Sequence, residues 1–176
     1  SITLPGGKAA PVVDATTVRP GATEVVASSP TRGGRAFLLA RLKPGTTAEQ
    51  FRKMTESKRL SERTIDRLGK TLSSFVAQGS APKDRGYSTV LDLQPGTYVA
   101  LDITNDKRQP QVAFEVAGER SAAPLPEAGA TVEMRDFKWS KTKDVLPAQG
   151  TLRVRNAGKQ LHFLLAMPAS SSKNAS

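Results

Sequence analysis

Short apolar runs separated by turns that contain proline and glycine dominate the first two thirds of the chain. Pro20-Gly21, Pro44-Gly45 and Pro95-Gly96 are typical of tight turns between strands. At 112–116 the apolar residues Val112, Phe114 and Val116 recur at every second position, the period of a strand with one buried face. The pattern predicts a mainly β protein with strands at 24–27, 36–42, 89–93, 97–103 and 112–116.

Two further alternating stretches lie nearer the C-terminal end. At 151–155 the alternation predicts a strand that buries Leu152 and Val154 and directs the intervening arginines to water. Between residues 132 and 139 the apolar phase slips by one position after Met134. A β-bulge near Arg135-Asp136 would return both halves of this stretch to the core face.

A helical pattern interrupts the strands at about 47–78. Thr46 and Glu49 have the spacing of a capping box, and apolar residues follow at intervals of three and four. The apolar stripe breaks near 57–61, so we expect two helices with a bend there. The predicted end of the helical segment is marked by Gly79 and Pro82.

The chain divides by pattern into a domain at 1–118, a linker at 119–129 and a second unit at 130–176. Phe37-Leu38-Leu39-Ala40 and Phe163-Leu164-Leu165-Ala166 each follow a proline-containing turn and a strand, which indicates a duplicated unit. The second copy is unfinished, and a half sandwich leaves strand edges unpaired. Completion within the chain, pairing with another copy and continuation in a longer protein all stay open.

The net charge is +10, from 26 basic and 16 acidic residues. Residues 1–118 hold 17 basic and 11 acidic groups, and residues 119–176 hold 9 and 5, so the excess is spread along the chain. The few aromatic residues are not interleaved with the basic ones, whereas a stacking platform for single-stranded nucleic acid combines both. A soluble basic surface is therefore favoured over a dedicated nucleic-acid site.

The absence of cysteine and the presence of a single histidine exclude several kinds of site. Disulfides, thiolate zinc sites, iron–sulfur clusters and cysteine nucleophiles require cysteine. A catalytic triad would have to use His162, and no second imidazole is available for a metal site. No apolar run approaches the ~20 residues of a membrane-spanning helix, so no transmembrane segment is expected.

The most specific stretch of the chain is Asn156-Ala157-Gly158-Lys159-Gln160-Leu161-His162. It resembles the cupredoxin pattern, in which an Asn-x-Gly turn leads into a strand that opens with a copper-ligand histidine. Leu93-Gln94-Pro95-Gly96-Thr97-Tyr98 is similar to the entry of the strand that normally ends in the copper cysteine of that family. The resemblance implies a Greek-key cupredoxin-like β-sandwich with an inserted helical segment, plus a second partial repeat. It also implies a secreted or cell-envelope bacterial protein.

The copper ligands of the family do not carry over to this chain. Ala36 stands at the position that matches His162 in the other repeat, Asp102 where the cysteine is expected and Gln111 where a histidine is expected. A blue-copper site needs one thiolate and two imidazoles, so we expect no cofactor and no electron transfer. A role of His162 as a metal ligand with Met134, Met167 or a carboxylate stays an alternative, but a histidine held by a hydrogen bond is favoured.

The leading hypothesis is a non-catalytic binding or assembly module, because no pair of nucleophile and base and no paired carboxylates are visible. Partners would be a protein or a second copy bound through strand edges, and an anionic polymer bound through the basic surface is an alternative. The candidate contact residues are Trp139, Lys138, Lys141, Arg59 and Arg63. The two arginines belong to the helical segment, where interspersed acidic residues favour a solvated face over a membrane-surface helix.

Overall fold

The computed structural model describes residues 1–55, 62–83, 86–104, 109–141, 149–160, 162 and 164, and at 62–66 it describes the backbone alone. These residues are mainly β, which confirms the prediction from alternation. The five strands predicted in the first two thirds of the chain are present as β4 (Gly21–Ser28), β5 (Arg35–Leu42), β7 (Tyr87–Leu93), β8 (Gly96–Asp102) and β9 (Gln111–Val116).

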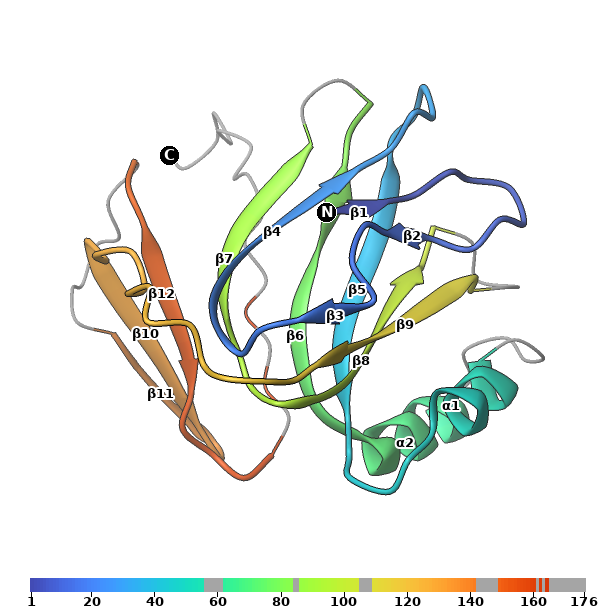
Figure 1. Cartoon of the computed structure of the whole chain (residues 1–176). Coiled ribbons are helices and arrows are strands. Elements are labelled where there is room, and N and C mark those ends of the chain that lie inside the picture. Colours follow the sequence, from blue (N-terminus) through green and yellow to red (C-terminus); the bar gives the residue numbers. More distant parts are fainter. Residues whose placement is uncertain are drawn as a thin grey trace, which may run out of the picture. The chain divides into compact units, whose positions relative to one another are not determined.

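Residues 1–127 contain two sheets (Figure 1). One sheet has the strand order β2-β1-β4-β7, and the other has the order β3-β9-β8-β5-β6. The sequence pattern did not reveal four of these strands, β1 (Ile2–Thr3), β2 (Val12–Val13), β3 (Thr17–Val18) and β6 (Leu72–Ala81). The first three are two residues long, too short for a period of two to show.

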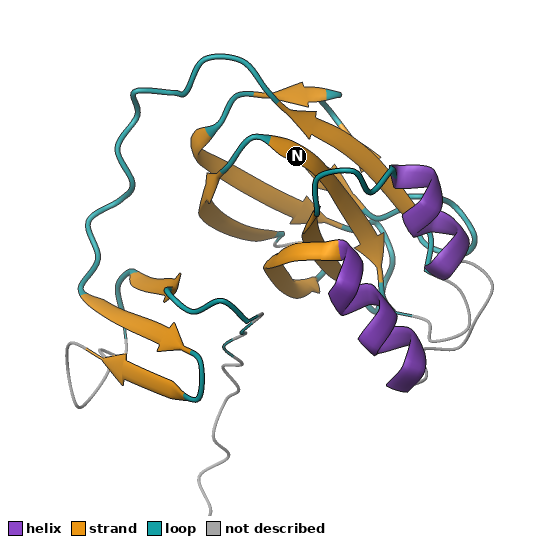
Figure 2. Cartoon of the chain, turned by 90° about the horizontal axis from the view of Figure 1, so that it is seen from below, coloured by secondary structure: helices purple, strands orange, loops and turns teal. Residues whose placement is uncertain are grey.

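The inserted helical segment consists of α1 (Ala48–Thr55) and α2 (Glu62–Thr71), which lie next to each other (Figure 2). Helix α1 packs on the outer face of the five-stranded sheet, where the Gln111 amide donates a hydrogen bond to the Thr55 hydroxyl over 2.9 Å. The central strand β8 is therefore buried on both faces, with Val99 and Leu101 on one side and Tyr98 and Ala100 on the other. The bend predicted at 57–61 lies outside the described residues.

Two details of the helical prediction are wrong. The capping box uses Thr47 and Gln50 instead of Thr46 and Glu49, since the Thr47 hydroxyl accepts from the Gln50 amide and the Gln50 side chain accepts from the Thr47 amide. Glu49 instead forms an ion pair with Arg52 on the exposed side of the helix.

The helical segment also ends earlier than predicted, because residues 72–78 belong to β6. This strand hydrogen-bonds along β5, from Leu42↔Leu72 to Arg35↔Ala81. Tertiary pairing outweighs the helical spacing of the apolar residues here, since serine and glycine contribute little helix propensity. Gly79 is not a helix end but lies beneath the Tyr87 ring, where an added Cβ would be 2.9 Å from that ring.

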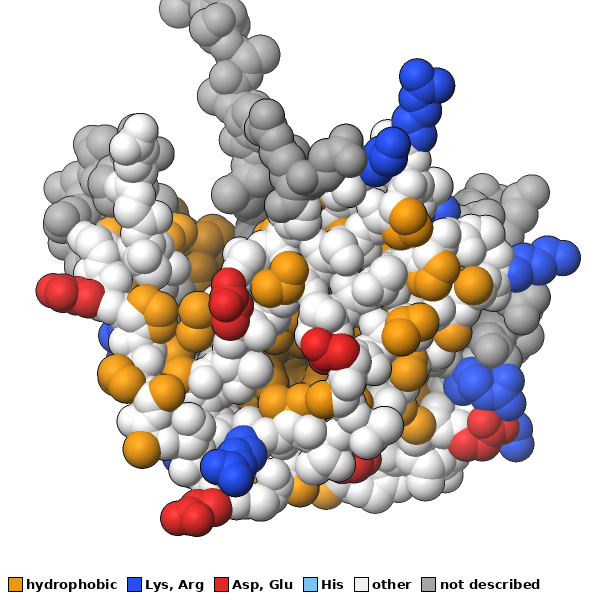
Figure 3. Space-filling model, turned by 45° about the horizontal axis from the view of Figure 1, so that its top comes forward, with side chains coloured by type: hydrophobic (Ala, Val, Ile, Leu, Met, Phe, Trp, Pro, Cys, Tyr) orange, Lys and Arg blue, Asp and Glu red, His pale blue; other side chains and the backbone are white. Residues whose placement is uncertain are grey.

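On the face shown in Figure 3 the Lys and Arg side chains form separate groups and no continuous basic patch. This distribution matches the even spread of charge along the sequence.

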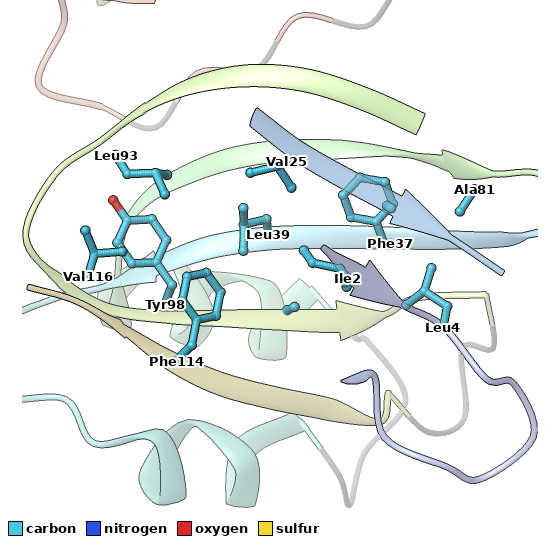
Figure 4. Packing of buried hydrophobic residues seen from close by; sticks show 12 residues of the cluster. Ile2, Leu4, Val25, Phe37, Leu39, Ala81, Leu93, Tyr98, Phe114 and Val116 are labelled. Carbon is cyan, nitrogen blue, oxygen red and sulfur yellow. The ribbon is translucent and has the colours of Figure 1, made fainter. Parts of the chain in front are cut away.

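The core of residues 1–127 lies between the two sheets (Figure 4). Ile2, Val25 and Leu93 contribute from one sheet, and Phe37 and Tyr98 from the other. The inward alternation predicted at 112–116 is confirmed, because Phe114 and Val116 are buried and Val112 packs against the same cluster. Two facing layers with a shared apolar interior fit a β-sandwich.

The turn between β7 and β8 is closed by the side chain of Tyr98. Its hydroxyl donates to the Gln94 carbonyl over 2.9 Å and accepts from the Gln94 amide over 3.0 Å. Burial raises the pKa of this phenol, which keeps the hydroxyl protonated and able to donate. A tyrosine that bonds back to the chain a few residues upstream, at the corner between two sheets, is a recurring feature of β-sandwiches.

The chain forms two compact units, Ser1–Glu127 and Ala128–Ser176. The second contains a three-stranded sheet of order β11-β10-β12, built from β10 (Ala130–Arg135), β11 (Lys138–Lys141) and β12 (Leu152–Asn156). Residues 117–129, which precede β10, contain no helix or strand. Of the second copy of the predicted repeat, 163–166, only Leu164 is described, so the repeat stays a prediction.

Candidate functional site

The β10–β11 hairpin carries the candidate contact residues of the second unit (Figure 1). The β-bulge predicted near Arg135-Asp136 is wrong, because Asp136 and Phe137 form a two-residue turn that closes the hairpin. Arg135 pairs with Lys138, and Met134 pairs with Trp139. The turn explains the phase slip, since cross-strand partners share a face and the chain reverses between them.

Phe137 occupies a backbone conformation that residues other than glycine and asparagine rarely adopt. Its φ is 61°, and it is the one non-glycine residue with positive φ in the described part of the chain. The left-handed region costs an ordinary L-residue about 1–2 kcal/mol. The side chain recovers none of this by packing, because it is 90% exposed.

The sheet of the second unit has one apolar and one charged face. The apolar face carries Ala130, Val132 and Met134 from β10, which are buried, and their cross-strand neighbours Trp139, Leu152 and Val154. On the opposite face Glu133 forms ion pairs with Arg135 and Arg155. The sequence prediction that Leu152 and Val154 are buried is wrong, since they remain 37% and 46% exposed. Both belong to β12, which has β10 as its single strand partner within the described sheet.

The carboxylate of Asp136 fixes the turn to the loop that follows β12. Asp136 Oδ2 accepts from the Lys159 amide over 3.1 Å, and Oδ1 accepts from the Gln160 amide over 2.9 Å. The pKa of Asp136 is lowered, first by these two backbone hydrogen bonds and then by His162. Charged Asp136 is therefore the form that holds the loop.

The Asn-x-Gly motif at 156–158 gives this loop its shape. The Asn156 side-chain oxygen accepts from the Gly158 amide over 3.0 Å, and its Nδ2 donates to the Gln160 carbonyl over 2.9 Å. A Cβ at position 158 would collide with the Asp136 carboxylate and would stand 2.9 Å from His162 Nε2. Glycine is thus required here so that the loop can approach the hairpin turn.

His162 is half-buried and lies beside the same carboxylate, with Nε2 3.1 Å from Asp136 Oδ1. One ring nitrogen is therefore engaged by an aspartate. Among the described side chains, no three His, Cys, Asp or Glu residues are placed to hold a metal ion together. Met167, which the sequence offered as a second ligand, lies outside the described residues.

The structure brings three of the five predicted contact residues together on the hairpin. Trp139 is 67% exposed, with Lys141 Nζ 6.0 Å from the ring centroid, and Lys138 is exposed on the opposite face. Arg59 and the side chain of Arg63 lie outside the described part of the chain. Phe137 was grouped with Trp139 as a possible aromatic surface but was not among the five predicted contact residues. The turn that exposes it was not predicted, although aspartate is common in turns and Asp136 lies at the phase slip.

The three positions that the cupredoxin resemblance assigns to copper ligands have structural contacts. Asp102 is 1% exposed and accepts from Arg35 Nε over 2.7 Å and from the Thr104 amide over 3.0 Å. The Ala36 amide donates to the Thr104 hydroxyl, and the Gln111 side chain donates to Thr55. The pairs Phe37↔Asp102 and Leu101↔Gln111 show that the three positions lie close to one another on adjacent strands.

A separate hollow of about 490 Å³ opens between the start of α1 and the outer face of β8 and β9. Among its lining residues Glu115 is the one titratable side chain, so the lining itself supplies no acid–base pair. The lining also includes four hydroxyl groups, from Thr16, Thr46, Thr47 and Thr97.

Comparison with known proteins gives no match. No family model matches the chain, and no curated protein or solved structure matches it either. Neither of the described helices has the length and hydropathy needed to cross a bilayer.

Proposed function

We propose that the protein is a non-catalytic binding module that works outside the cytoplasm and uses the β10–β11 hairpin as its contact surface. The observation that carries this proposal is the exposure of Phe137 (90%) and Trp139 (67%) at one hairpin. Isolated apolar side chains are common on surfaces, but two large aromatics beside lysines resemble the anchors of binding sites. Phe137 is almost wholly in water and Trp139 is buried only in part, so a contact outside the chain accounts best for both exposed rings.

The proposed scaffold is a cupredoxin-like sandwich without copper. The sandwich layers and the tyrosine-closed corner at Tyr98 support the scaffold. The buried ion pair between Arg35 and Asp102 supports the loss of copper, because it fills the position where the family has its thiolate. A secreted or envelope location follows from the resemblance alone.

The single tryptophan of the chain allows a direct test. Fluorescence of Trp139 and its quenching by acrylamide report on the hairpin without any label. We expect acrylamide to quench Trp139 strongly in the dilute protein, and one of four probes to protect Trp139 from quenching. The probes are heparin, single-stranded DNA, phospholipid vesicles and an excess of the protein whose Trp139 is replaced by Phe. If the accessibility of Trp139 stays the same with all four, the hairpin is not a contact surface for these classes and the proposal fails.

A further inference from the structure

We propose that the partner of the hairpin is the surface of an anionic phospholipid bilayer, into which Phe137 and Trp139 insert. This inference rests on the proposed function and names the partner of the same surface. Its basis is an exposed aromatic tip, cationic side chains on both faces of the hairpin behind it, and two hydrogen bonds that attach the turn to the loop at 156–160.

The tip residue is costly to the folded protein in two ways. Phe137 holds a left-handed φ of 61°, and its ring lies almost entirely in water. A glycine or asparagine at this turn position would remove both penalties. A strained, exposed aromatic side chain at a loop tip indicates a contact site, because the ring is stabilised only when it leaves water.

The spacing along the hairpin suits the depth of a bilayer interface. Trp139 is two residues behind Phe137, which places it about 7 Å behind the tip at the rise of a β-strand. Apolar groups of interfacial proteins reach about 5–10 Å into the boundary between headgroups and acyl chains. Phe137 would therefore enter that boundary while Trp139 lies at headgroup level, where tryptophan rings are enriched.

The cationic side chains of the hairpin lie on both of its faces, as contact with a surface that surrounds the tip would require. Lys138 and Arg135 project on one face of the hairpin, where Arg135 is also paired with Glu133, and Lys141 projects on the other face with Trp139. Residues 128–176 hold 8 basic and 3 acidic residues, a balance of +5. Lysine and arginine near an anionic bilayer each add attraction to its headgroups, and long side chains can reach those headgroups from either face.

This two-sided arrangement favours a bilayer over a polymer. A single strand of nucleic acid crosses one face and needs stacked aromatic rings beside cations on that same face. Here Lys138 and Trp139 alternate, so a strand on the apolar face would meet Lys141 but would leave Lys138 and Arg135 behind it. A planar interface that receives the whole tip engages both sets.

The tip is also held in a fixed orientation, which reduces the entropy lost on binding. Asp136 lies next to Phe137 in the turn and accepts two backbone hydrogen bonds from the 156–160 loop. The aromatic ring is thereby presented by a hairpin that is attached to the loop through the neighbouring residue.

The test measures binding of the full chain to vesicles of phosphatidylglycerol and phosphatidylcholine, by co-sedimentation and by the blue shift of Trp139 emission. We expect binding that weakens with salt and falls sharply on pure phosphatidylcholine. Phe137→Asn should lower the partition coefficient at least about tenfold, as expected for a phenylalanine that no longer leaves water. Lys138→Gln should lower it about fivefold. Lys8→Gln, the matched control in the first unit, should leave it unchanged.

The midpoint of thermal unfolding distinguishes insertion of Phe137 into a bilayer from a structural role of its side chain. Phe137→Asn should keep or raise the midpoint of thermal unfolding, because asparagine tolerates positive φ. A fall in the midpoint together with lost vesicle binding would overturn the insertion model for Phe137. Protection of Trp139 by heparin, DNA or the protein itself but not by vesicles would overturn the lipid proposal and leave the binding module. If none of the four probes protects Trp139, both the lipid proposal and the proposed binding module are overturned.

Discussion

At the scale of single residues, two aspartates show how this chain uses carboxylates. Asp102 is fully enclosed and neutralised by Arg35, while Asp136 lies at the edge of a turn and receives two backbone amides. Both carboxylates accept N–H donors from the protein itself. Both carboxylates therefore hold nearby backbone in place, Asp102 through the Thr104 amide and Asp136 through the amides of the 156–160 loop.

The anchor formed by Asp136 should depend on pH. Because the folded protein lowers the pKa of this group, the charged form stabilises the fold above the ordinary aspartate range. This stabilisation is lost as the pH falls through the lowered pKa. The amides of Lys159 and Gln160 should therefore exchange their hydrogens slowly at neutral pH. In acid, as Asp136 becomes protonated, their protection against exchange should be lost.

Asp136→Ala should abolish the protection of these two amides at every pH. Glu133→Gln changes a nearby acidic side chain that pairs with arginines on the charged face, so it serves as the control and should leave both amides protected. Retained protection in Asp136→Ala would show that the loop is held by other contacts.

At the scale of elements, the sequence revealed strands whose apolar residues alternate and failed where tertiary pairing decides. β9 was predictable because its inward residues recur at every second position, and β5 and β8 because each is a short apolar run bounded by turns that contain glycine or proline. β6 was not, since Leu72, Phe75 and Val76 have helical spacing and only the pairing with β5 shows them to be a strand. On the hairpin Trp139 and its lysines were predicted as contacts, but the position of Phe137 in an exposed turn was not, because a two-residue turn and a bulge shift the apolar phase alike.

The corner between β7 and β8 gives a prediction at this scale. Tyr98→Phe removes the donor to the Gln94 carbonyl and the acceptor of the Gln94 amide while the ring stays in the core. Loss of these partly buried hydrogen bonds should lower the free energy of unfolding by about 1–3 kcal/mol. Denaturant unfolding measures the change.

Tyr87→Phe is the matched control for Tyr98→Phe. The Tyr87 ring packs edge-on against Phe37, and no hydrogen bond to its hydroxyl occurs within the described residues. Its free energy of unfolding should change by less than about 0.5 kcal/mol. Equal losses in the two variants would refute the role assigned to the corner.

At the scale of the whole molecule, the chain is two compact units joined by a segment without regular structure. The start of this segment is attached to the first unit, since Arg120 pairs with Asp92 and the Ser121 amide donates to the Pro20 carbonyl. Residues 122–127 are exposed beyond that attachment.

Of Glu115, Glu119 and Glu127, a glutamate-specific protease should cut the native protein first after Glu127. Glu127 is exposed at the boundary of the units, whereas Glu119 is next to the attached Arg120 and Glu115 is paired within β9. Cleavage requires a backbone that can leave its hydrogen bonds, which favours the boundary. Mass spectrometry of a time course should show cleavage after Glu127 before cleavage after Glu119 or Glu115. Earlier cleavage at Glu115 would contradict the compactness of the first unit.

The pairing of β3 with β9 bears on the order in which the first unit is made. Thr17 aligns with Glu115, so one edge of the larger sheet joins residues from opposite ends of this unit. Contacts between distant positions slow folding, because a long loop must close before they form. On the ribosome β3 and β5 emerge well before β8 and β9 exist, and their unpaired edges stay open to other chains during that interval. The β10–β11 hairpin, by contrast, joins neighbouring residues and can form as soon as it leaves the exit tunnel. Translation speed between β5 and β9 is therefore expected to affect the yield of the first unit far more than the formation of the hairpin.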